Sequence, residues 1–146
     1  MSALLRNLAA VALLIAAALP ASAGERHKLA LQISDNTPEK MNAVLNVAAN
    51  VSSYYSEKGD EVEIQIVAFN AGLHMLRDDT SPVKPRLKSF KQSMPNVSFM
   101  ACENTLDAMA RSEGKPPPLV DNATRVKAGV VTLIELAEKG WTIVRP

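Results

Sequence analysis

The sequence Val97-Ser-Phe-Met-Ala-Cys-Glu-Asn-Thr105 contains a short apolar run that ends on the only cysteine of the chain. Its alternating apolar positions predict a buried strand. Asn104 or Thr105 is the expected cap of a following helix, because either side-chain oxygen can accept a hydrogen bond from a free backbone N–H. A strand that turns directly into a helix leaves its last residues at an open sheet edge, where α/β proteins place their chemistry. Any thiol function of this chain therefore falls on Cys102.

The rest of the chain alternates between strand and helix patterns. Short apolar or alternating runs predict strands over 29–33, 62–69, 97–101, 119–126 and 141–144. Apolar residues at three- and four-residue spacing predict helices over 38–58, 83–94, 105–112 and 130–137. This order predicts an α/β fold, a single three-layer sandwich in which a mostly parallel sheet of about five strands is flanked by helices.

The first 23 residues have the pattern of a secretory signal peptide. Arg6 precedes an uncharged apolar run over 8–19, and Ala21-Ser22-Ala23 is the small-residue pattern that a signal peptidase cuts after. The run is shorter than the roughly 20 apolar residues that a membrane span needs. We therefore expect residues 1–23 to be removed, residues 24–146 to form the domain, and the mature protein to be periplasmic, with no membrane contact.

Charge and composition argue against several classes of function. The chain has 16 basic and 15 acidic residues, so it lacks the basic face that nucleic-acid binding requires. A single cysteine allows no internal disulfide, which is unusual for an exported protein. Two histidines and one cysteine are too few to indicate a metal site, and no glycine-rich dinucleotide motif follows the first strand. We expect no metal and no cofactor.

Polar segments follow three of the predicted strands, at 34–36, 70–74 and 102–104. The carboxyl ends of parallel strands meet at one edge of a sheet. The topology therefore predicts that Cys102, His74 and Asn36 lie within reach of one another.

A thiol acts as a nucleophile only as the thiolate. The free N–H groups at the start of the next helix, or a protonated His74, would lower the pKa of Cys102, whereas the charge of Glu103 would oppose this. The alternative is a small buried structural cysteine at a strand end, with His74 an ordinary loop residue.

Four stretches of the chain resemble the DsrE/DsrF-like family of small sulfur-relay proteins, in its exported single-domain branch. They are Ser34-Asp35-Asn36, Asn70-Ala71-Gly72-Leu73, the turn from Phe99 to Thr105, and the segment from Lys139 to Pro146. The resemblance implies a five-stranded sheet flanked by helices and assembly into trimers or hexamers. It also implies a persulfide carried on a cysteine in the loop after a strand, and Cys102 holds the matching position. The well-studied relatives are cytoplasmic, and the residue after their cysteine is often small, where this chain has Glu103.

These patterns together lead us to expect an exported sulfur carrier. Cys102 would accept sulfur from a donor protein or a small sulfur species, and His74 would activate the thiol. Asn104 and Thr105 would shape the turn, and Asn36 and Asn70 would complete the binding site. The alternative is a non-catalytic oligomeric binding or assembly subunit with a structural cysteine.

Overall fold

The computed structural model describes residues 24–146. Its elements are β1 (Arg26–Ile33), α1 (Pro38–Lys58), β2 (Glu61–Ala68), the 3-10 helix η1 (Asn70–Leu76), α2 (Lys84–Ser93), β3 (Val97–Cys102), α3 (Glu103–Glu113), β4 (Ala123–Val126), α4 (Gly129–Glu138) and β5 (Thr142–Val144). The predicted signal peptide over 1–23 lies outside the described residues. Within the described part, no helix is both long and apolar enough to cross a membrane.

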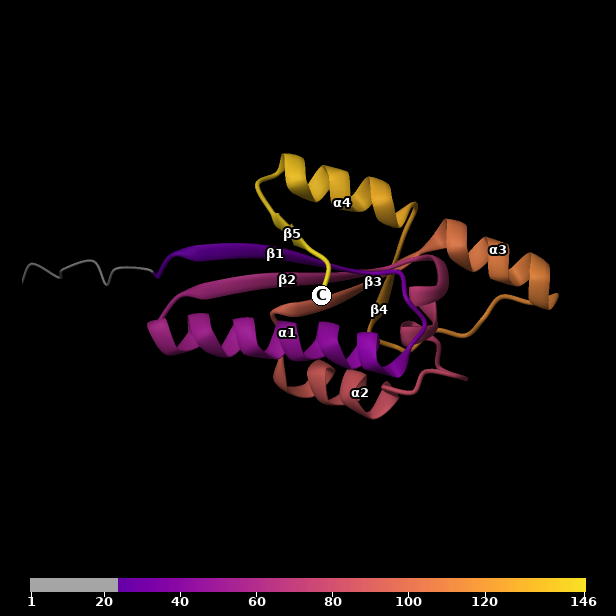
Figure 1. Cartoon of the computed structure of the whole chain (residues 1–146), viewed down its shortest axis with the longest axis horizontal. Coiled ribbons are helices and arrows are strands. Elements are labelled where there is room, and N and C mark those ends of the chain that lie inside the picture. The colour runs from indigo at the N-terminus through magenta and orange to yellow at the C-terminus, as the bar shows by residue number, and fades with distance from the viewer. Residues whose placement is uncertain (1–23) are drawn as a thin grey trace, which may run out of the picture.

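The five strands form one sheet in the order β4-β3-β2-β1-β5. Every neighbouring pair is parallel. Helices α1 and α2 lie on one side of this sheet and α4 lies on the other (Figure 1). The prediction of a three-layer α/β sandwich is confirmed, and the sheet is entirely rather than mostly parallel.

Helix α1 shows how local sequence sets an element of the fold. The Thr37 side chain caps its start by accepting a hydrogen bond from the Lys40 N–H at 3.3 Å, and Pro38 occupies the first turn. Gly59 ends the helix in the left-handed conformation, with φ of 77°, which a residue with a side chain adopts only with strain. The buried stripe between these ends packs on the sheet and consists of Met41, Val44, Leu45 and Ala48.

The sheet separates a larger apolar core from a smaller one. Phe99 and Ala101 of β3 belong to the larger core, under α1 and α2. Because successive side chains of a strand point to opposite faces, Cys102 points to the other side. There it joins the smaller core beneath α4, which also contains Ala30, Val67, Phe69, Leu133, Leu136 and Trp141.

Three predicted boundaries are wrong by two residues or more. Strand β1 begins at Arg26 rather than 29, because the polar residues Arg26, His27 and Lys28 also pair with β2. Strand β4 begins at Ala123 rather than 119, because the preceding residues pair elsewhere: the Val120 N–H donates to the Leu76 carbonyl, and Leu119 forms an isolated antiparallel bridge with Arg77. Helix α3 begins at Glu103, two residues earlier than predicted.

Candidate functional site

Cys102 occupies the junction between β3 and α3. It is the last residue of the strand and the N-cap of the helix, so the prediction that Asn104 or Thr105 caps α3 is wrong. The cysteine is only 5% exposed. The first backbone N–H groups of a helix have no acceptor within the helix. Those of Asn104 and Thr105 are therefore free to face the thiol, and both lower its pKa.

A second helix begins at the same place. Gly129 is the first residue of α4, and its backbone N–H also lowers the pKa of the Cys102 thiol. The absence of a side chain at Gly129 permits this approach: a Cβ atom there would lie 3.1 Å from the Cβ and Cδ1 atoms of Phe69. The N-termini of α3 and α4 therefore converge on one sulfur atom, and each favours a negative charge on it.

The Thr105 hydroxyl completes the surroundings of the sulfur. Its Oγ1 accepts a hydrogen bond from the Asn70 backbone N–H at 2.9 Å, which leaves the hydroxyl hydrogen free for the sulfur. Asn70 is the only non-glycine among residues 24–146 with a positive φ, 49°. Asparagine tolerates this left-handed conformation better than most residues, and here it directs the N–H toward Thr105.

The net effect of these groups favours the thiolate. Burial raises the pKa of Cys102, whereas the Gly129 N–H, the Thr105 hydroxyl, and the N–H groups of Thr105 and Asn104 lower it, and the result lies below the ordinary value for a thiol. Glu103, which was expected to oppose ionisation, is not among the main groups that shift this pKa. Its carboxylate lies 4.0 Å from the Lys127 ammonium.

The thiol opens onto a cavity of about 510 Å³, a volume typical of small-molecule sites. The cavity lies between the start of η1, helix α3 and the N-terminus of α4. It is lined by Phe69, Asn70, Cys102, Asn104, Thr105, Ala108, Met109, Ser112, Ala128, Gly129 and Val130. Of the predicted site residues, the structure therefore brings Asn70, Asn104 and Thr105 together with Cys102.

The structure places His74 and Asn36 elsewhere, and neither lines this cavity. His74 is half-buried in η1. The pKa of Glu113, at the far end of α3, is lowered mainly by the hydrogen bond from Arg77 and to a smaller extent by His74. Asn36 is exposed beyond β1, which is separated from β3 by β2. Topology put these residues at the correct edge of the sheet, but it could not show their distance from the thiol along that edge.

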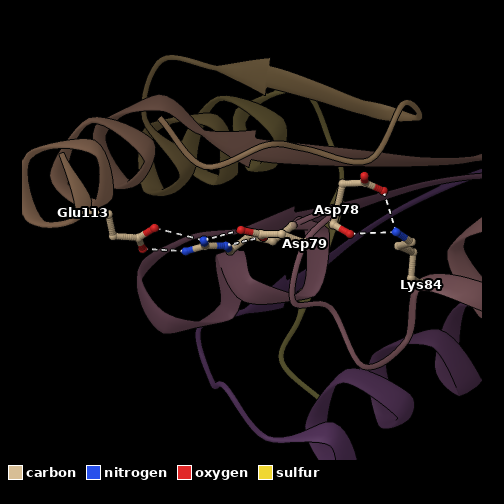
Figure 2. A network of polar contacts seen from close by, with 5 residues as sticks. Asp78, Asp79, Lys84 and Glu113 are labelled. Atoms are coloured by element: carbon tan, nitrogen blue, oxygen red, sulfur yellow. Dashed lines mark hydrogen bonds and ion pairs between the residues drawn. The ribbon is translucent and has the colours of Figure 1, made fainter. Parts of the chain in front are cut away.

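An ion-pair cluster that the sequence analysis missed ties η1 to α3 (Figure 2). The buried Arg77 guanidinium donates to Asp79 at 2.8 and 2.9 Å and to Glu113 at 2.6 and 3.0 Å. Hydrogen bonds from Arg77 lower the pKa of Asp79 to about 2 and lower that of Glu113, while both carboxylates raise the pKa of Arg77. The only sequence signal was an arginine followed by Asp78 and Asp79 directly after an apolar run. The cluster clamps the C-terminal end of the helix whose N-terminus faces the thiol.

The described residues hold no group of three or more histidine, cysteine, aspartate or glutamate side chains that could bind a metal ion. The cavity around Cys102 contains a nucleophile, hydrogen-bond donors and apolar walls. Such a set suits chemistry at the sulfur itself.

Comparison with known proteins identifies the fold and nothing more. No family model matches the chain, and no curated protein does. A similar solved structure is that of MTH1491 from Methanobacterium thermoautotrophicum, described as a protein of unknown function. It is 24% identical, the match covers 84% of this chain and 99% of that chain, and the TM-score is 0.65. At this identity the likeness shows a shared fold alone.

Proposed function

We propose that this protein is an exported sulfur carrier of the DsrE/DsrF-like type, which holds a persulfide on Cys102. The observation that supports the proposal most directly is the convergence of two helix N-termini and the Thr105 hydroxyl on one thiol that opens onto a cavity. A cysteine that served only to fill the core would need neither the donors nor the opening.

The proposed reaction transfers one sulfur atom between thiols. The Cys102 thiolate attacks the outer sulfur of a donor persulfide R–S–SH, so that a bond forms between Sγ and that sulfur as the donor S–S bond breaks. The donor leaves as a thiolate with the electron pair and takes up the proton that Cys102 released. The products are the Cys102 persulfide and the donor thiol, and the reverse step with an acceptor thiol delivers the sulfur, so no metal, cofactor or outside oxidant is required.

The groups around the sulfur suit both halves of this cycle. A persulfide is anionic near neutral pH, like the thiolate, and both forms benefit from the N–H groups of Gly129, Asn104 and Thr105. The apolar walls of the cavity would flank the outer sulfur. Nothing in this scheme needs His74, which lies outside the cavity, so the thiol would be activated by helix N-termini rather than by an imidazole.

We also propose that the protein is periplasmic after removal of residues 1–23 and that it assembles as a trimer or hexamer. The outer face of α4 supports assembly, because Val130, Val131 and Ile134 are between 51% and 53% exposed. Neighbouring exposed aliphatic side chains on one helix are typical of a contact surface. An assembly subunit with a structural cysteine is the second candidate function, and this same face favours it.

Intact-mass measurement distinguishes the two functions. The purified protein is incubated with the hydropersulfide of N-acetylcysteinamide, whose only ionisable group is its sulfur, beside the matched variant Cys102→Ser. The carrier predicts a gain of about one sulfur atom on wild type alone, reversed by dithiothreitol. No adduct on wild type, together with a folded-state thiol that iodoacetamide does not alkylate, would instead support the assembly subunit.

A further inference from the structure

The cavity beside Cys102 is lined without any charged side chain. Its apolar walls come from Phe69, Ala108, Met109 and Val130, and its remaining polar side chains are neutral amides and hydroxyls. The thiol is the only ionisable side chain among the lining residues. Most sites that bind charged metabolites provide an arginine or lysine to pair with a carboxylate, sulfonate or phosphate.

The positive potential in this cavity is concentrated at the sulfur. It comes from the N-termini of α3 and α4, which begin beside the sulfur at Cys102 and Gly129, and the effect of a helix N-terminus decays within one helical turn. Lys127, just before α4, pairs with Glu103 at 4.0 Å, and neither residue lines the cavity. A donor molecule therefore meets stabilisation for the sulfur being transferred and no side chain of opposite charge for any other charge that it carries.

On the basis of the sulfur-carrier function proposed above, we infer that the cavity selects donors whose reactive end is uncharged apart from the sulfur itself. The substrate class is an alkyl persulfide with no carboxylate, sulfonate or ammonium group close to the S–S bond. Inorganic thiosulfate, a dianion, falls outside this class, as does a persulfide whose carboxylates must enter the cavity. Moving such a group from water into the cavity costs free energy that the neutral amides and hydroxyls repay only in part, because none of them supplies an opposite charge.

Methanethiosulfonates that differ only in charge test this selection. The Cys102 thiolate attacks their sulfenyl sulfur, a mixed disulfide forms, and methanesulfinate leaves with the electron pair of the broken S–S bond. The rates of the 2-hydroxyethyl, 2-sulfonatoethyl and 2-aminoethyl reagents are measured on the purified protein by stopped-flow and intact mass. The rate of each reagent with the protein is divided by the rate of the same reagent with free N-acetylcysteinamide. Cys102→Ser is the blank.

We expect both charged reagents to react at least about tenfold more slowly than the hydroxyethyl reagent after this normalisation. Equal normalised rates for a charged and the neutral reagent would overturn the selection while leaving the carrier function intact. Failure of all three reagents would overturn both, because no sulfur donor could reach the thiol. Selection by charge without uptake of persulfide sulfur would overturn only the carrier function.

A matched pair of variants shows whether the cavity lining causes the selection. Ala108→Lys introduces a cation into the lining on an exposed turn of α3, and Ala137→Lys adds the same charge at an exposed position of α4 outside the cavity. We expect Ala108→Lys to accelerate the sulfonatoethyl reagent about tenfold relative to the hydroxyethyl reagent, and Ala137→Lys to leave the ratio unchanged. The same change in this rate ratio for both variants would show that overall charge causes the selection, and it would contradict an origin in the cavity lining.

Two sources can supply this donor chemistry, a free small molecule or a cysteine of another polypeptide. The hydropersulfide of N-acetylcysteinamide represents the first, and that of the blocked peptide acetyl-Gly-Gly-Cys-Gly-Gly-amide represents the second. Comparable transfer rates support a polypeptide donor, whereas transfer from the small molecule alone supports a free donor. Both results support the uncharged class, and transfer from neither contradicts it.

Discussion

Replacing Gly129 by alanine should raise the pKa of the Cys102 thiol. The added Cβ atom would lie 3.1 Å from two atoms of the Phe69 side chain, closer than ordinary van der Waals contact. Either the ring or the first turn of α4 must then move by a few tenths of an ångström. Phe69 is itself buried against the sheet, so the α4 terminus takes up part of the movement and its N–H withdraws from the sulfur.

The size of the effect follows from the hydrogen bond that is weakened. A hydrogen bond to a charged group contributes about 1.5–3 kcal/mol, and a difference of 1.36 kcal/mol between protonation states corresponds to one pKa unit. Partial loss of the Gly129 N–H therefore raises the pKa of Cys102 by about one unit. At a pH below both pKa values, the thiolate fraction and the alkylation rate fall about tenfold.

The assay is the pH dependence of iodoacetamide alkylation, with thiolate absorbance near 240 nm as a second readout. Gly140→Ala is the matched control, because it strains a glycine with φ of 82° at the opposite end of α4 and meets no atom within 4 Å. It should lower stability by about 1 kcal/mol and leave the thiol pKa unchanged. An unchanged pKa in Gly129→Ala, or the same rise in both variants, would refute the role of the α4 N-terminus.

Three further changes test other parts of the structure. Thr105→Val should raise the thiol pKa, and it should lower the free energy of unfolding by about 1–2 kcal/mol because it leaves the Asn70 N–H unpaired. Thr105→Ser should restore the thiol pKa, measured by alkylation, and the stability, measured by urea titration. A serine variant that behaves like the valine variant would contradict the role of the hydroxyl. In the wild type, Arg77 lowers the pKa of Asp79 from 3.8 to about 2. The ionised Asp79 therefore stabilises the fold fully above about pH 4, and this stabilisation is lost as the pH falls toward 2. Arg77→Met should remove this stabilisation and so weaken the dependence of stability on acid pH. Thermal unfolding at pH 2, 3, 4 and 7 checks this, and parallel Tm profiles for both proteins would argue against the cluster. Ile134→Lys should lower the assembly state measured by sedimentation velocity without changing the monomer fold, and an unchanged mass would exclude the outer face of α4 as the contact.

The sequence predicted those parts of the site that are local in the chain. An apolar run ending on Cys102 and followed by polar residues was enough to predict a strand, a turn and a helix N-terminus beside the thiol. It did not predict that the cysteine itself would take the cap position. That shift of two or three residues matters, because it makes Asn104 and Thr105 donors to the sulfur rather than caps.

The parts that depend on neighbours in space were not predicted. Gly129 reaches the sulfur because α4 follows β4, and β4 lies next to β3, an order of strands that no local pattern specifies. Arg77 reads in the sequence as an ordinary charged loop residue, and its burial depends on Glu113 returning from another helix. His74 was placed by topology at the edge where the strands end, but side-chain position along that edge needs coordinates.

The pairing of β5 with β1 has a consequence for the order in which the molecule matures. Leu29, Ala30 and Leu31 pair with Thr142, Ile143 and Val144, so the sheet is completed only by a contact that spans more than a hundred residues. Contacts of such high sequence separation form slowly, because the entropy cost of closing a long loop comes before the contacts stabilise the fold. Until then α4 has no edge strand to anchor it, and the Cys102 sulfur lacks the cover of α4 and one of its four donors, the Gly129 N–H. A chain in which β5 has not paired with β1 therefore leaves the Cys102 thiol less shielded from oxidants than the complete fold does.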